Sequence, residues 1–241
     1  MIITITVITF SLVQSLFGMG LLVFGTPTML LFGFSFPETL ATLLPASVTI
    51  SLLQILEGQD IDRSFKRSFF TWCIPSLALT LTAYLIWGSE IRLEFFLGLL
   101  MLIFALVRLA PTLTKRAGEF VKANIPLWMI GMGIIHGLSN MGGSVLSVVA
   151  GTYFTDKLQI RYAISFCYLC FGIVQISLLV FLQSDTIGVQ QLLMAPLAAL
   201  IYLIVGRKSF YSVSDALFQN MFTIFILLYS FLLITKSLGG L

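Results

Sequence analysis

Charged residues are scarce in this sequence. Asp, Glu, Lys and Arg make up 10% of the 241 residues, and 59% are hydrophobic, whereas about a quarter of the residues in soluble globular proteins are charged. The longest polar stretch, residues 111–124, is too short to form a soluble domain. We therefore expect an integral membrane protein whose main partner is the lipid bilayer. The net charge of +3 reflects short basic loops and does not indicate a nucleic-acid partner.

Cysteine and histidine are also rare. The three cysteines, Cys73, Cys167 and Cys170, all fall in apolar runs, and an odd number of such residues argues against a disulfide framework. The single histidine, His136, has no carboxylate near it in an apolar run, so the residues typical of an intramembrane active site are missing. The sequence predicts no metal, no cofactor and no enzymatic activity.

Apolar runs separated by short charged clusters fill the rest of the chain. They lack the period-two alternation of barrel strands, so they predict an all-α polytopic membrane protein. We expect ten elements: residues 2–17, 20–34, 37–56, 68–88 and 91–110, then 125–139, 142–154, 159–182, 187–206 and 213–236. The first two in each half would be only about 20 to 24 Å long, less than the roughly 30 Å hydrocarbon core. Each short pair should therefore form a re-entrant or half-length helical hairpin, followed by three transmembrane helices.

Five elements in each half predict two inverted repeats within one membrane domain. Residues 1–110 would form the first repeat and residues 125–241 the second, joined by a cytoplasmic basic linker at 111–124. An odd number of elements makes the second repeat start from the opposite face of the membrane. The two hairpins would then enter from opposite sides and meet near the middle.

The distribution of Lys and Arg predicts the orientation. If sides alternate across all ten elements, one side collects Arg63, Lys66, Arg67, Arg108, Lys115, Arg116, Lys122, Lys157, Arg161, Arg207 and Lys208, and the other only Arg92 and Lys236. Fusing each short pair into one span would give a much more even split. The positive-inside rule therefore favours the hairpins, in a multi-pass protein with both termini outside the cytoplasm.

Polar residues and glycines gather in residues 134–147, and a weaker copy lies at residues 12–25. The aligned pairs are Gln14 with His136, Gly18 with Asn140, Met19 with Met141 and Gly20 with Gly142. The third elements of the two halves also align, Ser47, Ser51 and Gln54 with Tyr168, Gly172 and Gln175, each trio on one helix face. Glycine-broken polar sequence at corresponding places in two halves is typical of the central binding site of a transporter.

These features predict an anion site between the hairpin tips. Helix N-termini at Gly20 and at residues 142–144 would direct free N–H groups into a cavity there. No Lys or Arg is expected inside an element, so neutral donors would hold the anion weakly and reversibly. His136 is the one titratable side chain at this depth and offers a route for protons. The alternative is a neutral histidine that is hydrogen-bonded to a carbonyl.

The candidate substrate-binding residues are Gln14, Gly18, Gly20, Ser47, Gln54, His136, Ser139, Asn140, Gly142, Gly143, Ser144, Tyr168 and Gln175. Structural roles are open for several of them. The Asn and Ser residues could cap a short helix, the glycines could be close helix contacts, and the glutamines could simply join helices.

The turns Gly18-Met-Gly20 with Pro27, and Asn140-Met-Gly142-Gly143, together with the order of elements, resemble the sulfite exporter TauE/SafE family over nearly the whole chain. The resemblance implies transport of sulfur-containing anions, such as sulfite or small organosulfonates, across the bacterial inner membrane. It also implicates the tip residues, which are Gln14, Gly18, Gly20, His136, Asn140, Gly142 and Gly143.

The sequence thus predicts a secondary transporter of small sulfur-containing anions, working by alternating access about a midplane site. Two alternatives stay open. One is a membrane assembly or partner subunit whose polar tips serve only packing, and the other is a passive anion channel. The particular anion, the direction of transport, the coupling ion and the formation of a homo-oligomer are all left open.

Overall fold

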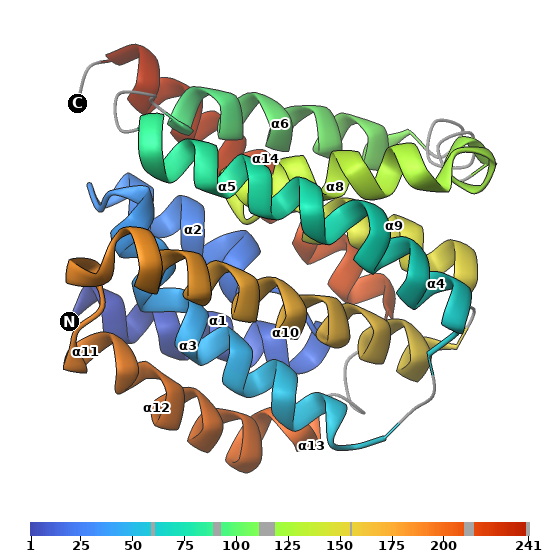
Figure 1. Cartoon of the computed structure of the whole chain (residues 1–241), viewed down its shortest axis with the longest axis horizontal. Coiled ribbons are helices and arrows are strands. Elements are labelled where there is room, and N and C mark those ends of the chain that lie inside the picture. Colours follow the sequence, from blue (N-terminus) through green and yellow to red (C-terminus); the bar gives the residue numbers. More distant parts are fainter. Residues whose placement is uncertain (59–60, 89–92, 111–118, 155, 210–214, 240–241) are drawn as a thin grey trace.

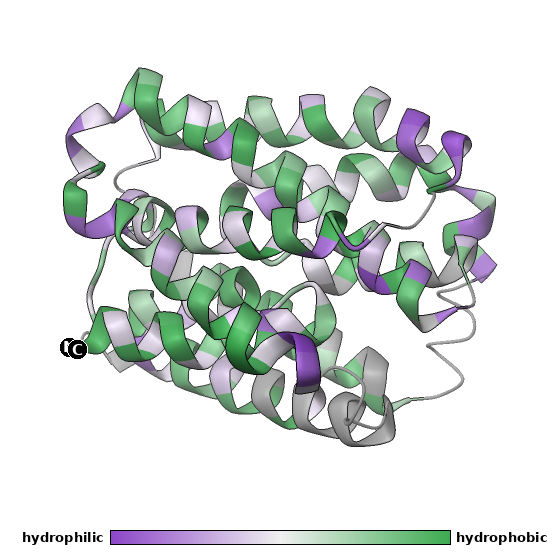
Figure 2. Ribbon diagram, turned by 90° about the horizontal axis from the view of Figure 1, so that it is seen from below, coloured by the Kyte–Doolittle hydropathy of each residue, from purple (hydrophilic) through white to green (hydrophobic). Residues whose placement is uncertain are grey.

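A computed structural model describes residues 1–58, 61–88, 93–110, 119–154, 156–209 and 215–239. In this part of the chain every regular element is a helix, so the all-helical prediction is confirmed there (Figure 1). Hydrophilic residues lie mainly at helix ends and in connections, and hydrophobic residues along the helices (Figure 2). The protein is built as a bundle of apolar helices.

The first half contains α1 (Ile2–Phe17), α2 (Leu21–Leu31), α3 (Phe36–Ile55), α4 (Arg63–Ser68), a π-helical turn (Phe69–Cys73), α5 (Ile74–Trp87) and α6 (Leu93–Leu109). The second contains α8 (Ile125–Ser139), α9 (Gly143–Tyr153), α10 (Lys157–Leu182), a 3₁₀ turn (Ser184–Thr186), α11 (Val189–Leu192), α12 (Met194–Ile201), a π-helical turn (Tyr202–Gly206), α13 (Arg207–Ser209) and α14 (Asp215–Gly239). Four continuous helical stretches are long and apolar enough to cross a membrane, namely Phe36–Ile55, Arg63–Trp87, Leu158–Leu182 and Val189–Ser209.

The helix lengths agree with the predicted short pairs. Helices α1 and α2 have 16 and 11 residues, and α8 and α9 have 15 and 11. Helix α4 begins earlier than expected, because the Asp62 carboxylate accepts a hydrogen bond from the Phe65 N–H and caps it. Most of the predicted linker, residues 111–118, lies outside the described residues.

Helix α10 is the centre of the bundle and packs against α3, α5 and α9, while α6 pairs with α14 (Figure 1). The start of α1 and the end of α14 lie at the same end of the bundle. There Ile2 and Phe32 line one pocket, and the Lys236 ammonium donates to the Leu30 carbonyl at 2.5 Å. We call the opposite end, where α3 ends, α10 begins and α13 lies, the basic end.

The two hairpin turns use residues that tolerate left-handed backbone. Gly18 has φ 73° and Gly20 has φ 152°, and in the second turn Asn140 has φ 61°. Asn140 is the one non-glycine residue with positive φ among the described residues, and asparagine adopts this conformation more readily than most residues. Glycine in one turn and asparagine in the other therefore end α1 and α8 in the same way.

Helices α5 and α8 approach closely because α8 carries small residues on the facing side. A Cβ added at Gly133 would lie 2.1 Å from Ser76 Oγ and 2.3 Å from the Cys73 carbonyl oxygen. One turn later, a Cβ at Gly137 would lie 2.2 Å from Thr80 Oγ1. Glycines spaced in this way allow backbones to pack closely where lipid supplies little hydrophobic driving force.

We expect Gly133→Ala to lower the free energy of unfolding by about 1–3 kcal/mol, because the added methyl group meets a backbone carbonyl that cannot rotate away. Gly131→Ala, two residues earlier in the same helix, is the matched control, since nothing lies within 4 Å of a Cβ there. Unfolding in mixed detergent micelles measures both changes. Equal losses in the two variants would contradict the close contact.

Candidate functional site

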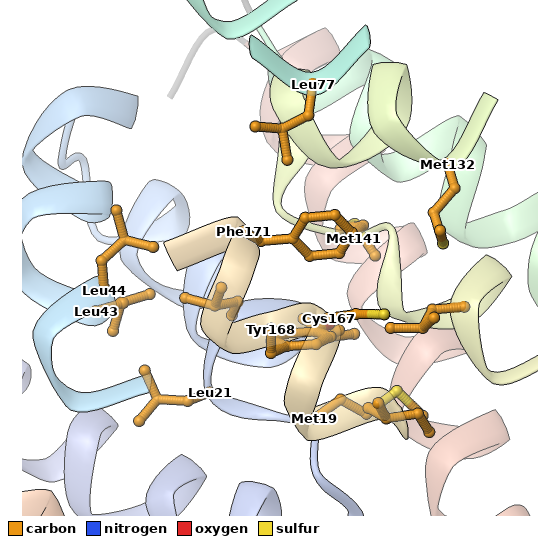
Figure 3. Close-up of a cluster of buried hydrophobic side chains, with 14 of the residues drawn as sticks. Met19, Leu21, Leu43, Leu44, Leu77, Met132, Met141, Cys167, Tyr168 and Phe171 are labelled. Carbon is orange, nitrogen blue, oxygen red and sulfur yellow. The ribbon is translucent and has the colours of Figure 1, made fainter. Parts of the chain in front are cut away.

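The two hairpin turns lie against each other beside the middle of α10. A Cβ added at Gly143, in the second turn, would lie 2.9 Å from Val23 Cγ2 and 3.1 Å from Met19 Sδ, both from the first hairpin. Figure 3 shows Met19 and Met141, one from each turn, in the buried cluster that also contains Tyr168 of α10. The candidate residues of the two halves therefore share one apolar core.

In the first half the polar residues satisfy one another. The Gln14 Nε2 group donates to the Ser47 carbonyl at 3.0 Å and to the hydroxyls of Ser47 and Ser51 at 3.0 and 3.1 Å. The Gln54 Nε2 group donates to the carbonyls of Gln14 and Ser15, both at 3.0 Å. The carbonyls of the last helical turn lack partners within their helix, so Gln54 completes the end of α1. This cluster is a closed structural network.

In the second half Asn140 joins three helices. Its Nδ2 group donates to Thr26 Oγ1 of α2 at 3.1 Å, and its Oδ1 atom accepts from Gln175 Nε2 of α10 at 2.8 Å. The Ser139 hydroxyl instead accepts from the Met141 N–H at 3.1 Å within the turn, and no side chain caps α9 at Gly142, so the capping alternative is not seen there. The Ser144 side chain lies outside the described part of the structure.

Three buried side chains beside this turn have unused polar atoms. Within the described residues, seven buried side-chain atoms lack a hydrogen-bond partner, and four of them belong to His136, Tyr168 and Gln175. The His136 ring stacks on Phe171 with 4.1 Å between centroids, and Gln175 lies next to it without a hydrogen bond of ordinary geometry. The alternative of a histidine bonded to a carbonyl is not seen there. A buried unpaired group costs about 1–3 kcal/mol, so this cluster calls for a functional explanation.

The N-terminus of α9 adds backbone donors to the same place. A Cβ at Gly142 would lie 3.0 Å from His136 Nδ1, and one at Gly143 would lie 2.1 Å from the Tyr168 hydroxyl. The first N–H groups of a helix have no intrahelical acceptor and favour an anion. The corresponding glycine of the first hairpin, Gly20, faces its own α1, because a Cβ there would lie 2.7 Å from Val13 Cγ1. The unpaired donors that lie beside a hairpin turn and a helix N-terminus therefore belong to the second half.

Sequence reasoning missed two residues of these networks. Arg161 lies inside α10 with its side chain only 8% exposed, so the expectation that no Lys or Arg lies inside an element is wrong. Arg161 was counted only as a basic residue at the start of the element expected at residues 159–182, whereas α10 begins at Lys157 and places it in the second turn. Thr26 was missed because its partner Asn140 is 114 residues away, and nothing in the local sequence marks it.

Comparison with known proteins gives one family. The family model described as Sulfite exporter TauE/SafE matches residues 3–233, which extend from α1 into α14. No curated protein and no solved structure matches the chain.

The unequal pairing of the two halves predicts unequal effects of one substitution at the aligned positions 14 and 136. Gln14→Leu removes the partner of two buried serines and should lower the free energy of unfolding by about 1–3 kcal/mol. His136→Leu removes two unpaired nitrogens and should leave stability unchanged or raise it. Unfolding of both variants in mixed micelles, without added anion, is the measurement. A comparable loss in His136→Leu would show that the imidazole is hydrogen-bonded after all.

Proposed function

The chain belongs to the sulfite exporter TauE/SafE family, a family of membrane transporters, and from this premise we propose that it carries small sulfur-containing anions, such as sulfite or an organosulfonate, across the bacterial inner membrane. The observation that carries the proposal is the buried set of unused polar atoms on His136, Tyr168 and Gln175 beside the N-terminus of α9. An anion that accepts hydrogen bonds from the imidazole N–H and the Tyr168 hydroxyl would remove the cost of leaving these buried donors unpaired. The unused Gln175 Oε1 atom is an acceptor and would not bond to the anion.

The donor chemistry supports an oxyanion. The imidazole, the Tyr168 hydroxyl and the α9 amides can each donate a hydrogen bond to an oxygen. They lie in an apolar shell that includes Phe171 and Met141, where hydrogen bonds are stronger than in water. Since all these donors are neutral, binding is weak enough for release. A protonated His136 would donate from both nitrogens, which gives a route for proton coupling.

The burial of the site supports a carrier over the two alternatives. His136, Tyr168 and Gln175 are each 0% exposed, so the site is closed to both sides, whereas a passive channel would keep it in contact with water. A partner subunit whose tips serve only packing would gain nothing from unpaired buried groups. We therefore assign an occluded state of an alternating-access cycle. In it two inverted halves rock about the turns, with both termini outside the cytoplasm.

Transport in proteoliposomes tests the assignment. We expect His136→Ala and Asn140→Ala to lower sulfite uptake at least about tenfold, equivalent to the loss of roughly 1.4 kcal/mol of binding. Tyr168→Phe should lower it as well, since it removes the hydroxyl and keeps the ring packed on Phe171. Gly131→Ala is the control and should transport normally. Unchanged uptake in all three site variants would remove these residues from the site.

Ligand-dependent unfolding identifies the anion. A ligand present at 100 times its Kd should stabilise the folded protein by about 2.7 kcal/mol. We expect sulfite or an organosulfonate to raise the Tm of the purified protein, and the same anion at the same concentration to raise the Tm of His136→Ala less. Carboxylates at equal ionic strength are the controls. A panel in which no oxyanion stabilises the protein would favour a partner subunit.

A further inference from the structure

A second polar cluster lies at the basic end, around one carboxylate. Glu57 follows α3, and its Oε2 atom lies 2.6 Å from Arg161 Nη2 of α10. Its Oε1 atom lies 3.4 Å from Arg207 Nε of α13 and accepts a hydrogen bond from the Tyr202 hydroxyl. Glu57 comes from the first half of the chain and its three partners from the second. One carboxylate therefore ties the two halves together.

This cluster differs from an exposed ion pair, which adds little to stability. The Arg161 side chain is 8% exposed and that of Glu57 24%, and Tyr202 is buried. Only Arg207, with a side chain 65% exposed, lies at the surface of the cluster. Two guanidinium groups and a phenol surround a single carboxylate, so the cluster keeps an excess of positive charge. Arginine is well suited to oxyanions because its planar group presents several donors in fixed directions.

We propose that Arg161, Tyr202 and Arg207 form a second oxyanion site, and that the Glu57 carboxylate occupies it as an internal competitor of the transported anion. A sulfite or sulfonate group offers oxygen acceptors and negative charge, as the carboxylate does, and can take over the same donors. Binding of the anion displaces Glu57. Because Glu57 is the carboxylate that joins the end of the first-half helix α3 to Arg161 and Arg207, its displacement frees this end of α3 from α10 and α13 and opens the basic end.

The cluster is joined to the first hairpin turn by hydrogen bonds. Arg161 Nη1 lies 3.4 Å from the Ser15 carbonyl, near the end of α1. The Ser165 hydroxyl lies 2.8 Å from Gln54 Oε1 and 2.9 Å from the Arg161 carbonyl. A Cβ at Gly18 would meet that same hydroxyl at 2.8 Å. Release of Glu57 therefore changes the contacts of residues that hold the first turn. An anion bound at the basic end thereby favours opening of the path to the central site.

The inference rests on the proposed function for the choice of anion, and the first experiment measures binding apart from transport. It uses the full-length His136→Ala protein, so that the central site does not contribute, and titrates sulfite against thermal unfolding at constant ionic strength. Adding Glu57→Gln should tighten sulfite binding about tenfold, as expected if the carboxylate occupies the site roughly nine-tenths of the time. A further Arg161→Gln should abolish the gain.

Glu38→Gln is the matched control. Glu38 is a carboxylate in the first turn of α3, at the opposite end from Glu57, and accepts hydrogen bonds from Ser35, so its loss should leave sulfite affinity unchanged. Glu57→Asp keeps the charge on a shorter side chain and should give an intermediate gain. It also serves as the test if Glu57→Gln does not fold. Sulfite affinities of the Glu57 variants equal to that of Glu38→Gln would overturn the proposal.

The second experiment measures opening. Ile164 is buried beside the first turn, and Ile164→Cys in a protein with Cys73, Cys167 and Cys170 replaced by Ala gives one reporter thiol. We expect Glu57→Gln to raise the rate of labelling by an impermeant maleimide severalfold from the basic end. An organosulfonate, which unlike sulfite does not react with maleimide, should have the same effect on the protein that keeps Glu57. An unchanged rate in both would overturn the role of Glu57 in closure. If His136→Ala loses transport but Glu57→Gln changes neither sulfite affinity nor the labelling rate, the central site is supported and this inference is refuted.

Discussion

The structure depends on the need to pair polar groups where the surroundings are apolar. Two chain reversals lie beside the middle of α10, and each leaves helix ends whose backbone groups cannot be satisfied within the helix. In the first hairpin the side chains of α3 supply the missing partners, through Gln54 on the Gln14 and Ser15 carbonyls. The need for these partners explains why glutamine and serine occur in helices that are otherwise apolar.

The two halves meet the same need to different degrees. Gln14 is surrounded by donors and acceptors, whereas His136, at the aligned position, stacks on an aromatic ring and has unused nitrogens. The paired network around Gln14 is rigid, because each bond must break before the turn can move. A half with unused donors can gain by taking up a ligand. We therefore regard the first hairpin as the support and the second as the binding element.

Charge is used differently along the bundle. The groups around the central turns are neutral donors in an apolar core, which suits transient binding of an anion. At the basic end, full charges meet across the two halves, with Glu57 between Arg161 and Arg207. Full charges give a strong but exchangeable contact when one partner can be replaced by another anion. The Glu57 contact at the basic end and the neutral site at the centre are compatible with three successive steps, in which the anion enters, binds and is released.

The all-helical class, the two pairs of short helices and the candidate turns could be predicted from the sequence, because they follow from local properties. Apolar run length, the glycines at 18 and 20 and the polar stretch around Asn140 each act within a few residues. The family could be suggested for the same reason. The inverted arrangement of the repeats stays a prediction, and the linker at 111–118 lies outside the described residues.

The sequence by itself determined that the chain is a helical membrane protein with polar turns, since composition and periodicity suffice for that. Only the tertiary structure decided which polar residues are paired. Asn140 meets Thr26, and Glu57 meets Arg161, across 114 and 104 residues of chain, and no local pattern encodes such partners. The structure likewise separated Gln14, which is satisfied, from His136, which is not. Pairing depends on how helices that are distant in the sequence pack together. Local patterns in a single sequence do not reveal that packing.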